Sequence, residues 1–256
     1  MISTKTFLTA ICASVIGLSS YAYAETTASS SPKLPFSEDQ RAAMEDFVRN
    51  FILDNPEVLM ESVNRHRTNE DKKKEQGSVD VLKANMAYLT NGTHPEIGNP
   101  KGDVMIVEFF DYNCGYCKHA MEVVRKLSEN DKNVRIIFMD LPILSPQSSI
   151  AAKWAVAANK QGKYWAFHQA LLESNAPKDE ENLTKIAITA GLDVTKLKKD
   201  AESKEIEEYL KSVKEFADKL SISGTPAFII GERIIRGYMD FEPFKSLVEE
   251  QRNIKR

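Results

Sequence analysis

The chain is poor in cysteine, has no excess of basic charge and lacks any long uninterrupted hydrophobic run. Its 256 residues include 3 cysteines, and 34 Lys and Arg stand against 37 Asp and Glu. Without a basic excess the chain has no electrostatic footprint for the phosphates of a nucleic acid, so nucleic acid is not an expected partner. No segment approaches the roughly 18 consecutive apolar residues that a membrane span needs. We therefore expect a soluble mature protein.

The first 24 residues have the layout of a cleaved secretory signal. Lys5 supplies a positive charge, residues 7–18 are largely apolar, and residues 22–24 read Ala-Tyr-Ala, the small-x-small form that signal peptidase cleaves. Cys12 lies inside the apolar stretch rather than after it, which disfavours a lipid-anchored cysteine. We expect residues 1–24 to be removed and the protein to reach a compartment where disulfides persist.

Residues 25–90 are expected to form a helical segment after a short flexible leader. Residues 25–35 are rich in Ser, Thr, Ala and Pro and show no apolar period. Ser37 and Gln40 have the spacing of a helix capping box. A helical apolar pattern follows at Met44, Phe47, Val48, Phe51 and Ile52.

A second helix is expected to begin at Pro56, because proline is favoured in a first helical turn. Gly77 is a candidate interruption of this helix. A seam with heptad-like spacing returns at Val79, Leu82, Met86 and Leu89. Two interpretations of these helices stay open: their apolar stripes pack on the rest of the chain, or they associate with a second copy.

Residues 91–256 carry the pattern of an α/β domain that opens with a strand-helix-strand unit. The continuous apolar runs at 104–110 and 134–139 predict strands that are buried on both faces. Between them, residues 117–127 show helical spacing of apolar positions. A helix that connects two such strands is typical of α/β folds.

The remainder of this domain is expected to be a helical insertion followed by a hairpin and a final helix. Helical patterns recur through about residues 146–222. After Gly224-Thr225-Pro226, short apolar runs at 227–230 and 233–236 flank a Gly-Glu turn, and a helix is predicted from about residue 241 to residue 251.

Two cysteines remain after the signal is removed, and they point to redox chemistry. Cys114 and Cys117 flank Gly115 and Tyr116, where the first strand ends and the helix begins. The free N–H groups at a helix N-terminus favour a thiolate. A thiolate attacks disulfides, and a second thiol one turn later can resolve the mixed disulfide. We therefore predict that Cys114 is the nucleophile and Cys117 the resolving thiol, with a moderately lowered pKa of Cys114, because Gly-Tyr supplies no cation.

Other interpretations of this pair fit less well. A structural disulfide that closes so small a loop would remove little chain entropy, and two unrelated buried thiols would not sit in a polar turn. A structural zinc site needs four ligands. The histidines are scattered without metal-ligand spacing, at positions 66, 94, 119 and 168. No metal and no bound cofactor are expected beyond the redox-active pair itself.

These residues resemble the DsbA-like branch of the thioredoxin superfamily. The resemblance rests on residues 108–117, which read Glu-Phe-Phe-Asp-Tyr-Asn-Cys-Gly-Tyr-Cys, on the helical insertion, and on Gly-Thr-Pro at residues 224–226 before a hairpin. It implies a thioredoxin-like fold over about residues 97–252. Residues 53–59 are similar to the N-terminal oligomerisation extension of ScsC-like members.

The resemblance also implies roles for single residues. Pro226 is expected to form a cis peptide bond beside the cysteines, where the backbone at Thr225 binds substrate peptide, with Gly115 and Tyr116 also facing the substrate. Glu108 matches the family's buried acid, which helps to move the proton of the resolving thiol. Many relatives have a Lys where Met139 stands, so Glu108 lacks that partner here.

Gly-Tyr between the cysteines and Thr before the proline are also found in DsbC, the dimeric isomerase. The resemblance therefore implies a thiol-disulfide oxidoreductase, free in the periplasm or associated with the outer membrane, that forms and especially isomerises disulfides. Its expected partners are unfolded or misoxidised secreted proteins, a membrane redox protein of DsbB or DsbD type, and a second copy of the chain, a dimer rather than a trimer. The alternatives are a monomeric dithiol oxidase and a chaperone or copper-binding module.

Overall fold

The computed structural model describes residues 36–254, so the expected signal peptide at 1–24 and leader at 25–35 lie outside the described residues. The chain separates into two compact units, one ending at Met60 and the other beginning at Glu61. Among residues 36–254, no helix is both long and apolar enough to cross a membrane.

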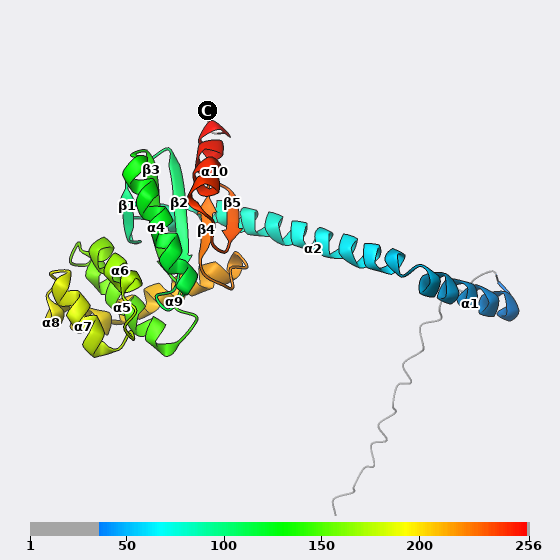
Figure 1. Ribbon diagram of the computed structural model, residues 1–256, viewed down its shortest axis with the longest axis horizontal. Coiled ribbons are helices and arrows are strands. Elements are labelled where there is room, and N and C mark those ends of the chain that lie inside the picture. Colours follow the sequence, from blue (N-terminus) through cyan, green and yellow to red (C-terminus); the bar gives the residue numbers. More distant parts are fainter. Residues whose placement is uncertain (1–35, 255–256) are drawn as a thin grey trace, which may run out of the picture. The chain divides into compact units, whose positions relative to one another are not determined.

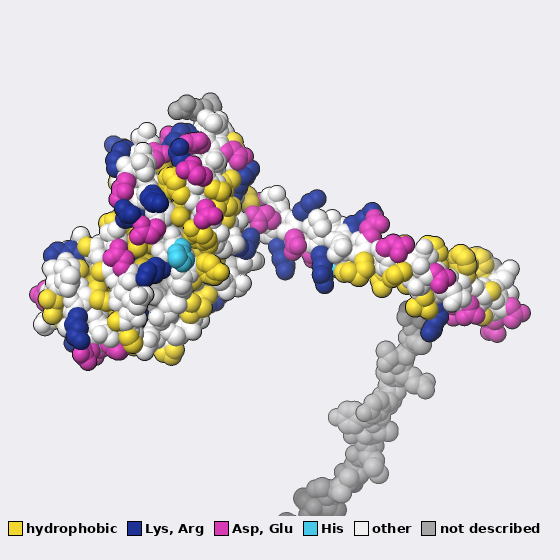
Figure 2. Space-filling model, viewed as in Figure 1, with side chains coloured by type: hydrophobic (Ala, Val, Ile, Leu, Met, Phe, Trp, Pro, Cys, Tyr) yellow, Lys and Arg dark blue, Asp and Glu magenta, His cyan; other side chains and the backbone are white. Residues whose placement is uncertain are grey.

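Helix α1 spans Glu38–Asp54 and begins at the expected capping box. The Ser37 hydroxyl accepts the Gln40 N–H, and the Gln40 side chain accepts the Ser37 N–H. None of its residues is buried. Phe47 is 69% exposed and stacks on Phe51 along the helix. Figure 2 shows hydrophobic side chains gathered on α1 and the first turns of the next helix.

Helix α2 spans Pro56–Ala84 and begins at the expected proline. It continues through Gly77, so the interruption predicted there is wrong. The helix is held on both sides of that glycine: Arg236 pairs with Glu75 at 2.9 Å, and the Ser78 hydroxyl donates to the Leu220 carbonyl at 3.0 Å. These contacts to distant residues offset the conformational freedom that makes glycine unfavourable in a helix.

The apolar seam at the end of α2 packs locally. Leu82, and Leu89 in the short helix α3 (Met86–Thr90), are buried in the same cluster as strand and helix residues of the second unit. The local-packing interpretation is therefore confirmed for these two positions. The second compact unit begins at Glu61 and so includes residues 61–90, which the sequence pattern places in the N-terminal helical segment.

Five strands form one mixed sheet in the order β1-β3-β2-β4-β5. Strands β2 and β3 are parallel, and the other neighbours are antiparallel. The strands are β1 (Glu96–Gly98), β2 (Val104–Phe110), β3 (Val134–Asp140), β4 (Ala227–Ile230) and β5 (Arg233–Arg236). Of these strands, β1 alone was not predicted. It has three residues and ends at Gly98, whose φ is 85°, so its sequence shows no alternation of apolar and polar residues.

Helices cover both faces of this sheet. Figure 1 shows α4 (Gly115–Asn130) across one face, where α10 (Phe241–Ile254) also packs. Helix α9 (Lys204–Lys219), α3 and the end of α2 share a core cluster with the other face. The helical insertion follows β3 as α5 (Pro146–Asn159), α6 (Tyr164–Glu173), α7 (Glu180–Thr189), α8 (Val194–Ala201) and α9. The predicted α/β fold with a helical insertion is confirmed.

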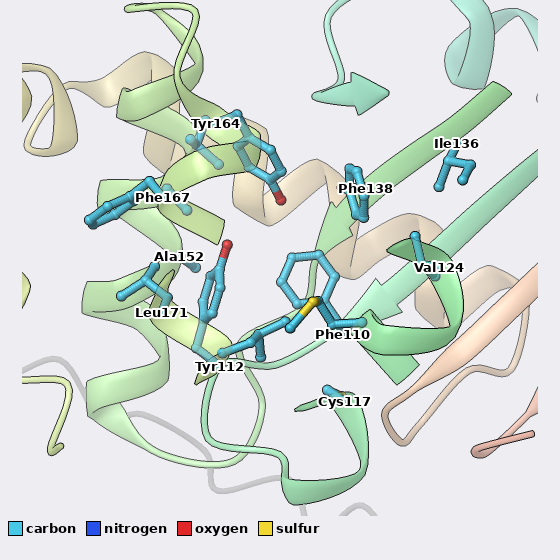
Figure 3. Packing of buried hydrophobic residues seen from close by; sticks show 14 of the residues in the cluster. Phe110, Tyr112, Cys117, Val124, Ile136, Phe138, Ala152, Tyr164, Phe167 and Leu171 are labelled. Atoms are coloured by element: carbon cyan, nitrogen blue, oxygen red, sulfur yellow. The ribbon is translucent and has the colours of Figure 1, made fainter. Parts of the chain in front are cut away.

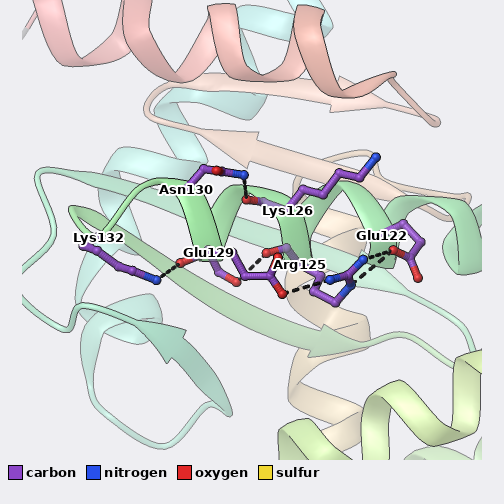
Figure 4. Close-up of polar contacts among 7 residues, drawn as sticks. Glu122, Arg125, Lys126, Glu129, Asn130 and Lys132 are labelled. Carbon is purple, nitrogen blue, oxygen red and sulfur yellow. Dashed lines mark hydrogen bonds and ion pairs between the residues drawn. The ribbon is translucent and has the colours of Figure 1, made fainter.

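Helix α4, which carries both cysteines at its start, is held by its inner face. Its buried residues belong to the core shown in Figure 3, with Cys117 and Val124 directed into it. On the outer face Arg125 pairs with Glu122 and Glu129 (Figure 4). Such exposed pairs contribute only about 0.2–0.5 kcal/mol each, so burial rather than charge fixes this helix.

Candidate active site

The turn before the cysteines is held by the carboxylate of Asp111. One oxygen accepts the Asn113 N–H at 2.8 Å, and the other accepts the N–H groups of Ile143 and Leu144 at 2.9 and 3.0 Å. The Cys114 N–H donates to the Asp111 carbonyl at 3.0 Å. Cys114 thereby becomes the N-cap of α4, in extended conformation, as the strand-to-helix junction predicted.

The two thiols of this helix lie in different environments. Cys114 is partly exposed and Cys117 is buried. A hydrogen bond from the Cys117 thiol is the largest cause that lowers the pKa of Cys114 to about 6, although its partial burial opposes this. The Thr225 side chain and the N–H groups of Cys117 and Tyr116 contribute to the same lowering of the pKa. A large fraction of Cys114 is therefore thiolate at neutral pH.

Burial raises the pKa of Cys117, and the hydrogen bond that it gives to Cys114 raises it further. Cys117 therefore keeps its proton at neutral pH. The pair consists of an accessible, ionisable sulfur beside a sulfur that must lose a proton before it can react. This division suits the predicted roles of Cys114 as nucleophile and Cys117 as resolving thiol, which stay predictions.

The segment at Thr225 and Pro226 lies against Cys114. The Thr225–Pro226 bond is cis, as the resemblance implied. The Cys114 thiol donates to the Thr225 carbonyl at 3.3 Å. Within residues 36–254 the buried Thr225 hydroxyl has no hydrogen-bond partner while Cys114 is protonated, so it can donate to the Cys114 thiolate. Beside the proline is a hollow of about 230 Å³, whose lining also includes Arg236 and Gly237.

Gly115 and Tyr116 occupy the outer surface of the site. Tyr116 is 65% exposed, and its ring lies 6.3 Å from that of Tyr238. The His119 ring lies 6.0 Å from Tyr238 on the next turn of the helix. No atom lies within 4 Å of the position that a Cβ at Gly115 would occupy. The surface beside Cys114 therefore has open space at Gly115 and an exposed aromatic ring at Tyr116.

Glu108 is fully buried in β2, below this surface. Neither of its carboxylate oxygens has a hydrogen-bond partner within residues 36–254. Burial is the main cause that raises its pKa to about 8, and the charges of Cys114 and Asp140 contribute to this rise. Among the described residues, no three His, Cys, Asp or Glu side chains are grouped as metal ligands would be.

Comparison with known families agrees with this geometry. The thioredoxin family model matches residues 90–250, more than half of the chain. The chain belongs to the thioredoxin family. The N-terminal domain of copper resistance protein ScsC matches residues 40–73, which include most of α1 and the first half of α2.

Several relatives of this thioredoxin-family chain are known. A thioredoxin-like oxidoreductase from Silicibacter pomeroyi DSS-3 is 39% identical with a TM-score of 0.63, over 65% of this chain and 97% of that one. Proteus mirabilis ScsC in a transitional conformation is 26% identical with a TM-score of 0.65, over 86% and 100% of the two chains. A probable disulfide bond formation protein D from Bacillus anthracis is 27% identical over 172 residues, covering 62% of this chain and 78% of the relative.

The chain also resembles part of a larger protein. It is 29% identical over 153 residues to Na(+)/H(+) antiporter NhaA 1 of Salinispora arenicola, and spans only 24% of that protein's length. The thioredoxin-like domain, by contrast, matches nearly the whole of the Silicibacter oxidoreductase. The expected resemblance is thus confirmed: the chain belongs to the thioredoxin family, is similar to DsbA-like oxidoreductases and has a segment that matches the ScsC N-terminal domain.

The thioredoxin-like sheet corrects the expectation about a partner for Glu108. In the parallel register Glu108 lies beside Phe138, and Phe109 lies beside Met139. Met139 therefore points to the opposite face and packs in a different core cluster. A Lys at position 139 would not reach Glu108.

The residue that the sequence interpretation missed is Asp140. It is fully buried, is in register with Phe110, and so shares the face of Glu108. A signal for it was present, since a lone acid directly follows the apolar run at residues 136–139. The carboxyl ends of parallel strands meet at the edge of the sheet where ligands and active sites are commonly found.

Proposed function

We propose that the protein is an exported, periplasmic thiol-disulfide oxidoreductase that forms and especially isomerises disulfides in secreted proteins. One observation carries the proposal: Cys114, partly exposed with a pKa lowered to about 6, lies beside a buried Cys117 that retains its proton. Such a pair can attack a disulfide through the ionised thiol and then resolve the mixed disulfide through the second thiol. No other redox group is needed.

The chemistry begins at Cys114. Its thiolate attacks one sulfur of a substrate disulfide, a new Cys114–substrate disulfide forms, and the second substrate sulfur leaves as a thiolate. In isomerisation a different substrate thiolate then attacks the mixed disulfide, and Cys114 leaves again as a thiolate. Alternatively Cys117 loses its proton and attacks Cys114, which forms the Cys114–Cys117 disulfide and releases reduced substrate.

The acidity of Cys114 supports isomerisation rather than strong oxidation. The strong oxidase DsbA has an active-site pKa of about 3.5, and thioredoxin has one of about 7. A very low pKa stabilises the reduced form and makes the disulfide strongly oxidising. With a pKa of about 6, Cys114 is less stabilised as a thiolate than in a strong oxidase. Its mixed disulfides can therefore form and break again.

The substrate is proposed to bind across the cis-proline segment. The Thr225 backbone is positioned beside Cys114, the hollow next to Pro226 is open, and Tyr116 offers an exposed ring. An extended peptide can pair with such backbone and pack an apolar side chain on the ring. These features suit unfolded or misoxidised proteins, in which extended apolar segments are accessible.

The N-terminal helix is proposed to join copies of the chain into a homo-oligomer, with a dimer as the simplest symmetric assembly. Exposed contiguous apolar surface is unusual on a monomer and commonly marks an interface. The apolar side chains exposed here are Met44, Phe47, Val48, Phe51, Ile52, Leu53, Val58, Leu59 and Met60. An oligomer would place several thiol pairs around one substrate and hinder a dedicated membrane oxidase, so that a reductase of DsbD type would maintain Cys114.

Recovery of scrambled ribonuclease tests this proposal. The full mature protein is compared with Phe47→Glu/Phe51→Glu, which adds two negative charges to the apolar face of α1, and with Arg49→Glu, which changes the charge of the same helix equally. We expect wild type and Arg49→Glu to unscramble, and the double variant to be monomeric and deficient. Rapid oxidation of reduced substrate by all three, without unscrambling, would instead identify a dithiol oxidase.

A further inference from the structure

Asp140, at the end of β3, is a buried acid that the chemistry described so far does not use. Its Oδ2 accepts a hydrogen bond from the Tyr164 hydroxyl at 3.0 Å. Its Oδ1 is buried without a partner among residues 36–254. Since Asp140 is in register with Phe110, it lies one strand away from Glu108 on the same face of the sheet.

Among residues 36–254, no cationic side chain acts on either acid. The groups that act on Glu108 are Cys114 and Asp140 themselves, and Glu108 in turn disfavours ionisation of Cys117. Asp111 acts on Asp140 as a further negative charge. Two carboxyl groups in a dry site do not ionise independently, so the first charge makes the second much less favourable.

Burial raises the pKa of both acids, of Asp140 to about 7 and of Glu108 to about 8, and the phenols explain why Asp140 ionises first. Hydroxyl groups of Tyr164 and Tyr112 stabilise the Asp140 carboxylate, whereas Glu108 has no donor. Figure 3 shows the Tyr112 and Tyr164 rings with their oxygens directed into the same part of the interior. Tyr112 also contacts His168 Nδ1 at 3.0 Å, and burial lowers the pKa of that histidine to about 3, so it stays neutral. Tyr209 is likewise a neutral phenol near Asp140.

We propose that Asp140 is a positioning residue which, by holding the first negative charge of the pair, keeps Glu108 protonated at neutral pH and so delays the attack of Cys117. The inference rests on the proposed function. Its consequence is a longer-lived mixed disulfide on Cys114. A substrate thiolate then has time to attack before Cys117 releases the substrate, which favours isomerisation over reduction.

The delayed step is a proton transfer followed by thiol-disulfide exchange. Cys117 gives its proton to the Glu108 carboxylate, and the Cys117 sulfur attacks the Cys114 sulfur. The Cys114–substrate bond breaks, the intramolecular disulfide forms, and the substrate leaves as a thiolate with the electron pair. While Glu108 is protonated it cannot accept this proton, so the step requires the pH to approach the pKa of Glu108, about 8.

The test is the pH profile of substrate release in a single turnover. The mixed disulfide of Cys114 with a model peptide is formed at low pH, and Cys117-dependent release of the peptide is followed from below the pKa of Cys114 to above that of Glu108. Asp140→Asn should move the midpoint down by about one pH unit, with release up to about tenfold faster at neutral pH. Met139→Leu, one residue away on the opposite face, should leave the midpoint in place.

Tyr164→Phe serves as the second variant. It keeps both acids but removes a donor to Asp140, so the midpoint should move in the same direction by a smaller amount. An unchanged midpoint in Asp140→Asn, or in Tyr164→Phe if the first variant does not fold, would overturn the inference. Failure of wild type to unscramble ribonuclease would instead count against the proposed function, because the release profile is measured without any isomerisation.

Discussion

The sulfur of Cys114 lies 3.3 Å from the carbonyl oxygen of Thr225, a residue 111 positions later in the chain. This contact brings the N-terminus of α4 and the cis-proline segment together, although the helical insertion separates them in sequence. The thiol donates to the carbonyl, whereas a thiolate is stabilised by donors such as the Thr225 hydroxyl. The protonation state of Cys114 is therefore coupled to the surface where we propose that the substrate binds.

The thiolate of Cys114 should stabilise the reduced protein. Its pKa falls from 9.0 to about 6 on folding. The stabilisation is therefore fully present above pH 9 and is lost as the pH falls through 6. Urea unfolding of the reduced wild type and of Cys114→Ala should show a difference in the free energy of unfolding that becomes smaller as the pH is lowered from 9 to 6. A difference that is constant with pH would show that the thiolate is not stabilised in the folded state.

The hydroxyl of Thr225 should lower the pKa of Cys114. In Thr225→Val it is replaced by a methyl group of similar size, and loss of a hydrogen bond to a charged group should raise the pKa by about one unit. The ultraviolet absorbance of the thiolate measures this directly. Thr225→Ser keeps the hydroxyl and should titrate like wild type; equal pKa values in the Val and Ser variants would refute the role of the hydroxyl.

Glu108 should destabilise the fold as the pH rises. Because burial raises its pKa from 4.5 to about 8, the folded state disfavours its charged form, and stability declines between these values. Glu108→Gln cannot ionise. Relative to wild type, its free energy of unfolding should therefore increase by on the order of 3 kcal/mol between pH 4.5 and neutral pH. Parallel stability curves for the two proteins would contradict the raised pKa of Glu108.

The end of α2 should contribute to the stability of the thioredoxin-like unit, whereas its beginning should not. Leu82 is 1% exposed and Leu59 is 53% exposed. Leu82→Ala should cost about 2–5 kcal/mol in the free energy of unfolding, and Leu59→Ala should remain within about 0.5 kcal/mol. Denaturant unfolding of the two variants at equal concentration, low enough to keep the chain monomeric, compares them. Equal losses in the free energy of unfolding would mean that both ends of α2 contribute equally to the stability, which contradicts the prediction.

The parts of the fold that could be predicted are those where local pattern and final environment agree. The buried run at 104–110 became β2, and the capping box at Ser37 and Gln40 begins α1. Strand β1 could not be predicted because pairing with β3, not its own sequence, makes it a strand. The helix through Gly77 likewise depends on contacts with Leu220 and Arg236, far away in sequence.

The candidate active site also has residues that the sequence predicts and residues that it does not. Cys114 and Cys117 could be found from spacing alone, because their chemistry depends on a helix N-terminus that the adjoining strand predicts. Glu108 and Thr225 needed the resemblance. Asp140 was missed because its relation to Glu108 follows from the register of two parallel strands, which decides that it, and not residue 139, faces the active site.

Trapping of the mixed disulfide tests the central claim most directly. Cys117→Ala, in which the resolving thiol is absent, is incubated with scrambled ribonuclease and analysed by mass spectrometry after acid quenching. The account predicts a covalent adduct on Cys114 that reductant removes, and a loss of adduct formation by more than about a thousandfold in Cys114→Ala, as when other enzymes lose their nucleophile. Absence of an adduct on Cys114 would contradict the account.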